Sequence, residues 1–430
     1  MALVFAAAVG LAAAAAARAG AGDAGAGGGS AAAPPAEDKG GFWPQFHGPG
    51  RDNMSTETGL LAQWPEGGPP LAWTFADAGR GYAGVSVAGG RIYTSGDFGA
   101  DEYVIALDLQ GRLLWKTANG PSWRGSTPGA RATPTHVDGT LYHMGPMGRL
   151  AAFEARTGKE LWAVDTAQVF GARPGTWGLA ENVLVEDNLV LCAPGGDRGR
   201  IVALDRATGR TAWANTTIPD GVAYGSPIVV THGGVRQFIT LLRATVVGVD
   251  VRTGRLLWSH PHPNRYNQNV DRPVVHAGRV FVASGHKAGA RVIEISPASD
   301  AAREVWFSEA FDNCHGGVLL LGGHLYGCGC RLYSKGLMCV EFATGRTVYR
   351  VEGIGKPSLT WAEGRFYGID QEGRAMLIRA DPNGAEVASE FRIPMEGKDQ
   401  SLAHPVVCGG RLYLRQDRNV FAYDIRAKAE

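Results

Sequence analysis

An all-β fold, an eight-bladed β-propeller of four-stranded antiparallel blades, is predicted by three features of the sequence. Gly accounts for 62 of the 430 residues, about twice its usual ~7% share, which indicates many tight turns. Short alternating apolar runs bounded by Gly turns are typical of strands. A related unit also recurs about every 46 residues, the length of one four-stranded blade.

The repeated unit is clearest in its second half, where an apolar strand leads into an acidic residue, a Gly turn and an aromatic residue. In one copy, Asp205 is suited to accept backbone N–H bonds within the turn, and Gly209 to take the left-handed position. The closing Trp is expected to lie in the outer strand and pack between neighbouring blades. Well-preserved copies occupy residues 105–115, 152–162, 203–213 and 248–258.

Eight copies can be aligned on their first, innermost strand. The last copy ends after its third strand, and an orphan strand at residues 69–75 precedes the first copy. We expect this N-terminal strand to complete the last blade and close the ring, because an open solenoid would leave two unpaired edges. The eight first strands align at Val85, Pro134, Asn182, Pro227, Pro273, Val318, Leu359 and Pro405.

The N-terminal region has the composition of a leader followed by a linker. Residues 1–19 are interpreted as a cleavable signal peptide, an apolar run that ends in Ala17-Arg18-Ala19. An Ala-rich helix or a retained anchor is the alternative. Residues 20–41, rich in Gly and Ala, are interpreted as a linker, and the propeller is expected over residues 42–430. The protein is therefore expected to be exported, periplasmic or extracellular, with no transmembrane segment in the mature chain.

The charge balance argues against two kinds of partner. The 42 Lys and Arg residues offset 41 Asp and Glu residues, which leaves a net charge of +1. This balance supports neither nucleic-acid binding nor a polybasic membrane anchor. We expect a monomer whose partner is an unknown protein or small-molecule ligand.

The repeats, with their pattern Ala-Leu-Asp-x-x-Thr-Gly-x-x-x-Trp, resemble those of pyrroloquinoline-quinone (PQQ) propellers of the quinoprotein alcohol dehydrogenase-like superfamily. Residues 43–52, Trp-Pro-Gln-Phe-His-Gly-Pro-Gly-Arg-Asp, look like the opening of secreted PQQ-like proteins. The resemblance implies one of two functions. One is a non-catalytic binding or scaffold module, similar to the propeller lipoprotein of the β-barrel assembly machinery. The other is a PQQ-dependent dehydrogenase that oxidises an alcohol or sugar.

The resemblance also states what the catalytic alternative would need. Such a dehydrogenase holds PQQ over the channel mouth with a Trp floor, a vicinal disulfide, a Ca²⁺ ion and an Asp base. No two Cys are adjacent in this chain, and the nearest approach is Cys328-Gly329-Cys330. The non-catalytic module without a cofactor is therefore preferred, and PQQ with Ca²⁺ remains the alternative. A third alternative, a hydrolase or lyase that acts on a polysaccharide, is supported only by the general shape of the propeller.

Candidate binding residues lie in the loops that enter the innermost strands, because these loops converge on the channel of a propeller. Aromatic rings, cations, carboxylates and imidazoles around one opening suit a small molecule or a peptide. Polar residues that merely line a water-filled channel are the alternative. No zinc or haem spacing is present, so no metal is expected. The candidates are Tyr82, Arg131, Trp177, Tyr224, Asn269, Asp271, Asp312, Asn313, His315, Lys356 and His404.

The six Cys residues raise the question of disulfides in an exported protein. Cys328 and Cys330 share one face of the expected second strand of blade six, and Cys339 lies on the neighbouring third strand. A bridge from Cys339 to Cys328 or Cys330 is therefore predicted, with plain core packing as the alternative. Cys192 and Cys408 are expected to be buried thiols in distant blades.

Overall fold

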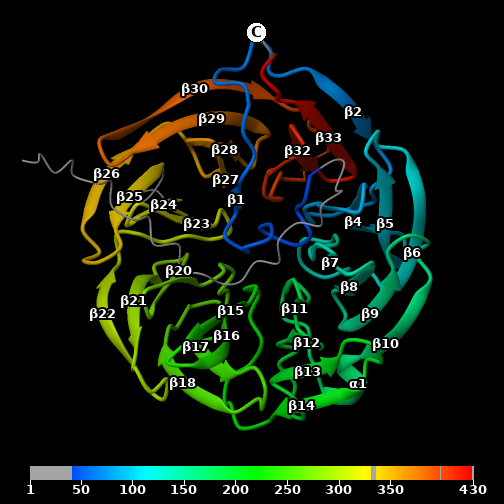
Figure 1. The fold of residues 1–430 in the computed structure, drawn as a ribbon, viewed down its shortest axis with the longest axis vertical. Coiled ribbons are helices and arrows are strands. Elements are labelled where there is room, and N and C mark those ends of the chain that lie inside the picture. Colours follow the sequence, from blue (N-terminus) through cyan, green and yellow to red (C-terminus); the bar gives the residue numbers. More distant parts are fainter. Residues whose placement is uncertain (1–40, 331–335, 398, 429–430) are drawn as a thin grey trace, which may run out of the picture.

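The computed structural model describes residues 41–330, 336–397 and 399–428. In these ranges the chain forms eight sheets arranged around one axis (Figure 1). The predicted signal peptide, and all of the predicted linker except Gly41, lie outside the described residues. Each blade runs from its innermost to its outermost strand by antiparallel pairing, which confirms the predicted eight-bladed propeller.

The first four blades follow the chain in order. Their inner strands are three to five residues long. Blades one and two contain β3 (Ser86–Ala88), β4 (Arg91–Phe98), β5 (Asp101–Asp108), β6 (Leu113–Pro121), β7 (Thr135–Val137), β8 (Thr140–Met144), β9 (Arg149–Glu154) and β10 (Glu160–Asp165). A short helix, α1 (Thr166–Phe170), leads to blade three. Blades three and four contain β11 (Leu184–Glu186), β12 (Leu189–Cys192), β13 (Ile201–Asp205), β14 (Thr211–Asn215), β15 (Ile228–His232), β16 (Val235–Leu241), β17 (Thr245–Asp250) and β18 (Leu256–Pro261).

The second half repeats this order. Blades five and six contain β19 (Val274–His276), β20 (Arg279–Ser284), β21 (Gly289–Ile295), β22 (Ala302–Ser308), β23 (Val318–Leu321), β24 (His324–Cys328), β25 (Leu337–Glu341) and β26 (Thr347–Val351). Blades seven and eight contain β27 (Ser358–Ala362), β28 (Arg365–Ile369), β29 (Arg374–Asp381), β30 (Gly384–Arg392), β31 (Val406–Cys408), β32 (Arg411–Gln416) and β33 (Asn419–Asp424).

Two N-terminal strands join the ring to the start of the chain. Strand β2 (Leu71–Phe75) pairs antiparallel with β33, with Phe75 opposite Val420. It is the outer strand of blade eight, so the predicted closure is confirmed. Strand β1 (Met54–Ser55) pairs in parallel with β27 and adds a fifth, innermost strand to blade seven, an addition to the predicted four-stranded blade.

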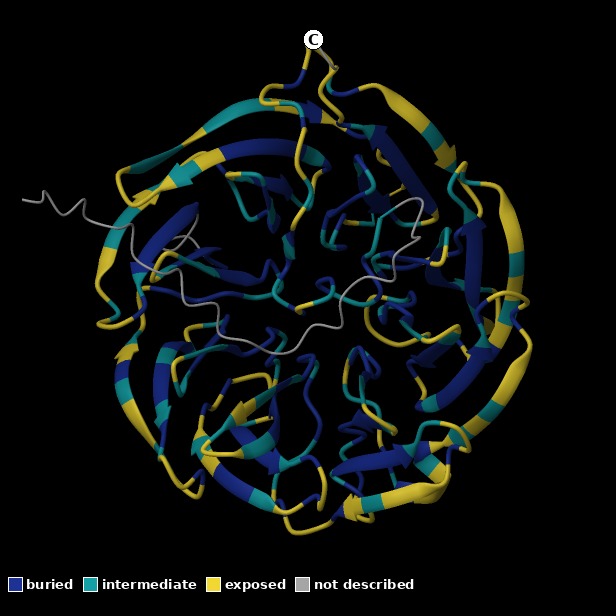
Figure 2. Cartoon of the chain, viewed as in Figure 1, coloured by how far each residue is buried: buried dark blue, intermediate teal, exposed yellow. Residues whose placement is uncertain are grey.

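Tryptophans of the repeat connect neighbouring blades. The Trp162 Nε1–H donates to the carbonyl oxygen of Arg206 at 3.0 Å, in the next blade. Gly209 lies against the same indole, and a Cβ there would be 2.7 Å from the Trp162 ring. The outer strands therefore alternate between exposed and half-buried residues, around a buried interior (Figure 2). The same contact to the next blade is made by Trp73, Trp115, Trp213 and Trp306.

Candidate functional site

Residues 43–55, here called the channel segment, lie along the inner strands at the centre of the ring. Trp43 and Val87 of β3 exchange two backbone hydrogen bonds of 2.8 and 2.7 Å. The Pro44 carbonyl accepts from His136 N of β7 at 2.7 Å, and the Asn53 carbonyl from Trp361 N of β27 at 3.0 Å. Three blades thus bind this segment by their inner edges, where β1 is seen near the middle of Figure 1.

Local backbone geometry explains how the segment turns back on itself. His47, Arg51 and Asn53 all adopt positive φ, of 64°, 50° and 63°. Gly48 also has positive φ, and a Cβ there would lie 2.9 Å from the Trp43 ring. The Asn53 N–H then donates to the His47 carbonyl at 2.9 Å, which closes the loop. Left-handed backbone at non-glycine residues carries strain, so the contacts with the surrounding blades must hold this conformation.

Arg51 anchors the segment to blade three. Its guanidinium is buried and donates to the carbonyl oxygens of Asn182 at 2.7 Å and Val183 at 3.1 Å. It also donates to the Gln45 side chain at 3.0 Å. Burial lowers the pKa of Arg51 to about 9 and raises the pKa of the neighbouring Glu181 carboxyl to about 8. The charged guanidinium is therefore held by backbone dipoles, and Glu181 is largely protonated at neutral pH.

A pair of histidines joins the segment to blade eight. The Nε2 of His404 donates to the carbonyl oxygen of His315 at 2.9 Å, because a carbonyl can only accept. Its Nδ1 must then accept, and both the His47 Nε2–H at 3.2 Å and the Asn53 amide at 3.1 Å point to it. Burial lowers the pKa of His404 to about 4, and burial and the nearby His404 hold the pKa of His47 well below its usual range. Both rings are therefore neutral at physiological pH.

The space beside these histidines is nearly filled. The cavity lined by Phe46, His47, Asn53, His404 and neighbouring residues of blades one, two and eight has a volume of about 10 Å³. A cavity of this size holds about one water molecule. The two imidazoles therefore hold the channel segment to the ring, and the cavity beside them is too small for a substrate.

Several of the predicted mouth residues contact one another or a neighbouring side chain. The Arg131 guanidinium lies 5.6 Å from the centroid of the Tyr82 ring. Trp177 and Tyr224 meet edge to face at 5.5 Å. His315 bonds to the Gln371 side chain at 2.9 Å, and burial, followed by the nearby Lys356 charge, lowers the pKa of His315 to about 4.

The remaining candidates are engaged inside the loops. The buried Asn269 amide donates to the carbonyl oxygens of Leu242 and His262, and its oxygen accepts from Ser284 Oγ at 2.6 Å. Asp312 accepts from Cys330 N at 3.0 Å. These side chains shape the loops.

Two further candidates are also buried. Asn313 donates to the carbonyl oxygens of Gly317 and Cys328. Asp271 is buried beside Arg272, and burial raises its pKa to about 7. Neither is therefore part of an open set of groups at the mouth.

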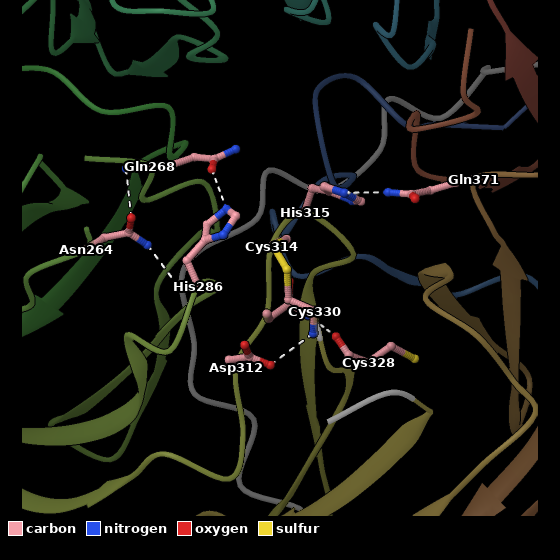
Figure 3. The surroundings of a disulfide bond; sticks show 11 residues. Asn264, Gln268, His286, Asp312, Cys314, His315, Cys328, Cys330 and Gln371 are labelled. Atoms are coloured by element: carbon pink, nitrogen blue, oxygen red, sulfur yellow. Dashed lines mark hydrogen bonds between the residues drawn. A yellow bond between two sulfur atoms is a disulfide. The ribbon is translucent and has the colours of Figure 1, made fainter. Parts of the chain in front are cut away.

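The disulfide of the structure has a different pairing from the predicted one. Cys330 is bonded to Cys314, with their Cα atoms 5.4 Å apart (Figure 3). Cys328 and Cys339 are buried thiols. The predicted bridge from Cys339 is wrong because Cys339 lies opposite Tyr326 in the β24–β25 register, while Cys328 lies opposite Leu337. Cys330 follows the end of β24 and reaches the loop that carries Cys314. The expectation that Cys192 and Cys408 are buried thiols is confirmed.

Sequence reasoning missed three residues of the channel segment and two residues outside it. His47, Arg51 and Asn53 bond to blades eight, three and seven, and Gln371 and Asp399 contact the predicted residues His315 and Tyr82. The dense run of His, Gln, Arg and aromatic residues at 43–52 was a usable signal. Its position before the first repeat gave no indication that it enters the ring.

The described residues contain neither a metal-binding cluster nor a helix suited to span a membrane. Residues 41–330, 336–397 and 399–428 contain no group of three or more His, Cys, Asp or Glu side chains placed to hold a metal ion. In the same part of the chain no helix has the length and apolar character needed to cross a membrane.

Comparison with known families gives one match to more than half of the chain. The model of a family described as "Outer membrane protein assembly factor BamB" matches residues 100–351. The BamB of Alkalilimnicola ehrlichii is 28% identical over 234 residues, which cover 50% of this chain and 52% of that protein. The quinohemoprotein alcohol dehydrogenase ADH IIB of Pseudomonas putida is 30% identical over 144 residues, 31% of this chain and 20% of that protein. The chain thus spans about half or less of the length of these relatives.

Solved structures agree on the fold. A europium-containing methanol dehydrogenase superposes with a TM-score of 0.62 at 14% identity, over 88% of this chain and 90% of that chain. The BamB of Moraxella catarrhalis superposes with a TM-score of 0.54 at 15% identity, over 77% and 95%. At these identities the likeness concerns the propeller fold alone.

Proposed function

The chain belongs to the family described as outer membrane protein assembly factor BamB, and we propose that it is an exported, non-catalytic binding or scaffold module. One observation carries the proposal: the chain's own residues 43–55 occupy the centre of the ring. A propeller whose centre is filled keeps its loops and its outer strands for contacts with other molecules. The relatives include a protein named as an assembly factor, and a protein partner is accordingly part of the proposal.

A quinone cofactor fits these residues poorly. Its polycyclic ring system would need an open site over the channel, whereas the cavity beside His47 and His404 has about 10 Å³. The disulfide joins residues 16 positions apart and is not a vicinal one. Asp312 and Asn313, two of the predicted mouth residues with oxygens suited to a cation, are bonded to the backbone of Cys330, Gly317 and Cys328. We therefore derive no catalytic step through PQQ.

The outer strands provide an apolar surface for a protein partner. Leu71 of β2, Leu113 and Leu114 of β6, and Leu161 of β10 are exposed on three consecutive blades. Exposed apolar residues and a free strand edge are features by which sheets capture extended segments of other proteins.

A cofactor titration tests the non-catalytic function. The purified protein is incubated with PQQ and Ca²⁺, separated from free quinone, and assayed for quinone absorbance and dye reduction with a panel of alcohols and sugars. A quinoprotein alcohol dehydrogenase is the positive control. We expect no stoichiometric quinone and no turnover. Stoichiometric binding accompanied by turnover would contradict the proposal.

Cross-linking tests the protein-binding part. A partner recovered from the native envelope should be lost in the variant Leu113→Asp/Leu161→Asp and retained in Val169→Asp, since Val169 is also exposed but lies on α1. Equal recovery with both variants would rule out the outer strands as the binding surface.

A further inference from the structure

A second hollow lies away from the channel segment, between blades three and four. Its volume is about 280 Å³, near the lower end of the range for small-molecule sites. Three arginines from separate parts of the chain line it. Arg173 follows α1, Arg200 belongs to the β12–β13 hairpin, and Arg243 to the β16–β17 hairpin. The hollow therefore lies on the face that carries the loops between the outermost strand of one blade and the innermost strand of the next. The predicted mouth residues lie on the same face.

The charges in this hollow are unbalanced. Asp197 is the one carboxylate among its lining residues, and its Oδ1 lies 2.6 Å from Arg200 Nη2. Arg200 also donates to the Gly195 carbonyl at 2.7 Å. Among the described residues, the guanidiniums of Arg173 and Arg243 make no hydrogen bond or ion pair and are exposed to solvent. Two guanidinium groups thus border one small space in which Asp197, the one lining carboxylate, is paired with Arg200.

Glycines allow the chain to pack closely around the hollow. A Cβ at Gly221 would lie 2.9 Å from Arg243 Nε, and a Cβ at Gly195 would lie 2.5 Å from the Val222 side chain. The amides of the β12–β13 loop are not free donors, because Gly195 N and Gly196 N bond to carbonyls of the same loop. Recognition in this hollow must therefore come from the arginine side chains.

We propose that this hollow binds a small organic anion, a molecule that presents carboxylate or phosphate oxygens. A guanidinium offers two parallel N–H donors that match a carboxylate or a phosphate, and two uncompensated guanidiniums favour a ligand with more than one negative charge. The volume leaves room for a carbon framework beside the anionic group. The site is separate from the channel and goes beyond the proposed function, since it requires neither a protein partner nor the absence of a quinone.

Calorimetric titration tests the proposal with three probes: inorganic phosphate, glucose 6-phosphate and citrate. We expect saturable binding of glucose 6-phosphate or citrate that is tighter than that of inorganic phosphate and is weakened by added NaCl. Preference for the sugar phosphate assigns a phosphorylated ligand, and preference for citrate a carboxylated one.

Matched variants separate the site from general charge effects. Arg173→Ala/Arg243→Ala should weaken binding at least tenfold, with an unchanged thermal midpoint, because within the described ranges neither guanidinium makes a hydrogen bond or an ion pair. Arg210→Ala/Arg252→Ala removes the same charge from exposed turns of the same two blades and should leave binding unchanged. Saturable binding of none of the probes, or equal loss in both double variants, would overturn the proposal.

Discussion

The Nε2 atom of His47 lies 3.2 Å from the Nδ1 atom of His404, so residues 357 positions apart meet at the centre of the ring. His404 follows the last strand of blade seven, and His47 belongs to a segment that precedes every blade. The pair therefore fastens the beginning of the propeller to its end, in addition to the pairing of β2 with β33.

This contact should make stability depend on pH. The pKa of His404 is about 4 in the folded protein, against about 6.5 when unfolded. The unfolded chain binds more protons between these values, so the free energy of unfolding falls as the pH falls from 6.5 to 4, by at most about 3 kcal/mol. The nearby charges of His315 and Arg272 lower the pKa of His404 further, whereas its hydrogen bond to the His315 carbonyl raises it. The pKa values of His47 and His315 are themselves lowered, so their titration changes stability in the same direction as that of His404.

In the variant His404→Gln, the free energy of unfolding should fall less steeply with pH when urea unfolding is measured between pH 6.5 and 4. His324→Gln, at the half-buried first position of β24, is the control and should keep this pH dependence. The comparison between variants is needed because Glu181 and Asp271 have raised pKa values. These two carboxyl groups stabilise the folded protein at low pH, opposite to His404, and their contribution to the free energy of unfolding is lost as the pH rises. Parallel curves for wild type and His404→Gln would contradict this account.

Arg51→Ala should destabilise the protein strongly. The change removes the donor to the buried carbonyls of Asn182 and Val183, and unsatisfied buried acceptors with lost charged hydrogen bonds cost about 2–4 kcal/mol. Urea unfolding at pH 7 measures the difference. Arg210→Ala, at an exposed turn, should change stability by less than about 0.5 kcal/mol. A small effect of Arg51→Ala would mean that the channel segment adds little to the fold.

Two glycines of nearly equal φ allow the effect of packing to be separated from that of backbone strain. Gly345 has φ +76° and Gly364 has φ +78°. A Cβ at Gly345 would lie 2.6 Å from the Trp306 ring, while a Cβ at Gly364 would have no neighbour within 4 Å. Gly345→Ala should therefore cost about 1–3 kcal/mol more than Gly364→Ala, as measured by chemical unfolding. Equal costs would show that the Trp306 indole can shift to accommodate the added Cβ at little energetic cost.

The disulfide pairing predicts a thiol count. The four thiols of Cys192, Cys328, Cys339 and Cys408 should titrate in denaturant without reductant, and all six cysteines after reduction. Cys314→Ser should add one thiol by freeing Cys330 and should cost about 3 kcal/mol, as expected for a loop of this length. Cys328→Ala should leave the disulfide intact and remove one thiol. A disulfide that persists in Cys314→Ser would contradict the pairing.

Much of the ring could be predicted because its information is repeated. Asp205, Gly209 and Trp213 recur in equivalent forms, and each copy folds into the same blade, so errors in one copy are corrected by the others. Counting the strands in each copy also shows that blade eight lacks its outer strand, and β2 supplies that strand. Mouth residues such as Tyr82, Arg131 and His315 were placed in the loops by the same alignment, but their individual contacts were not predicted.

The cysteines show where spacing stops being informative. The alternation of apolar and polar residues correctly places Cys328 within β24. It gives no information about the path of the chain after the strand ends at Cys328. Cys330 lies past that point, and the direction in which the loop leaves the sheet decides that it meets Cys314. Likewise, Arg173 and Arg243 are ordinary exposed loop residues in the sequence, and only the packing of blade three against blade four puts them around one hollow.

Local periodicity by itself determined the number of blades, their order and the strand that closes them, because strand alternation and turn chemistry act over a few residues and recur eight times. Only the tertiary structure decided what fills the centre. Residues 43–55 occur once, carry no period, and take strained backbone conformations that contacts with five different blades hold in place. Such contacts join residues hundreds of positions apart, and no local preference in the chain encodes them.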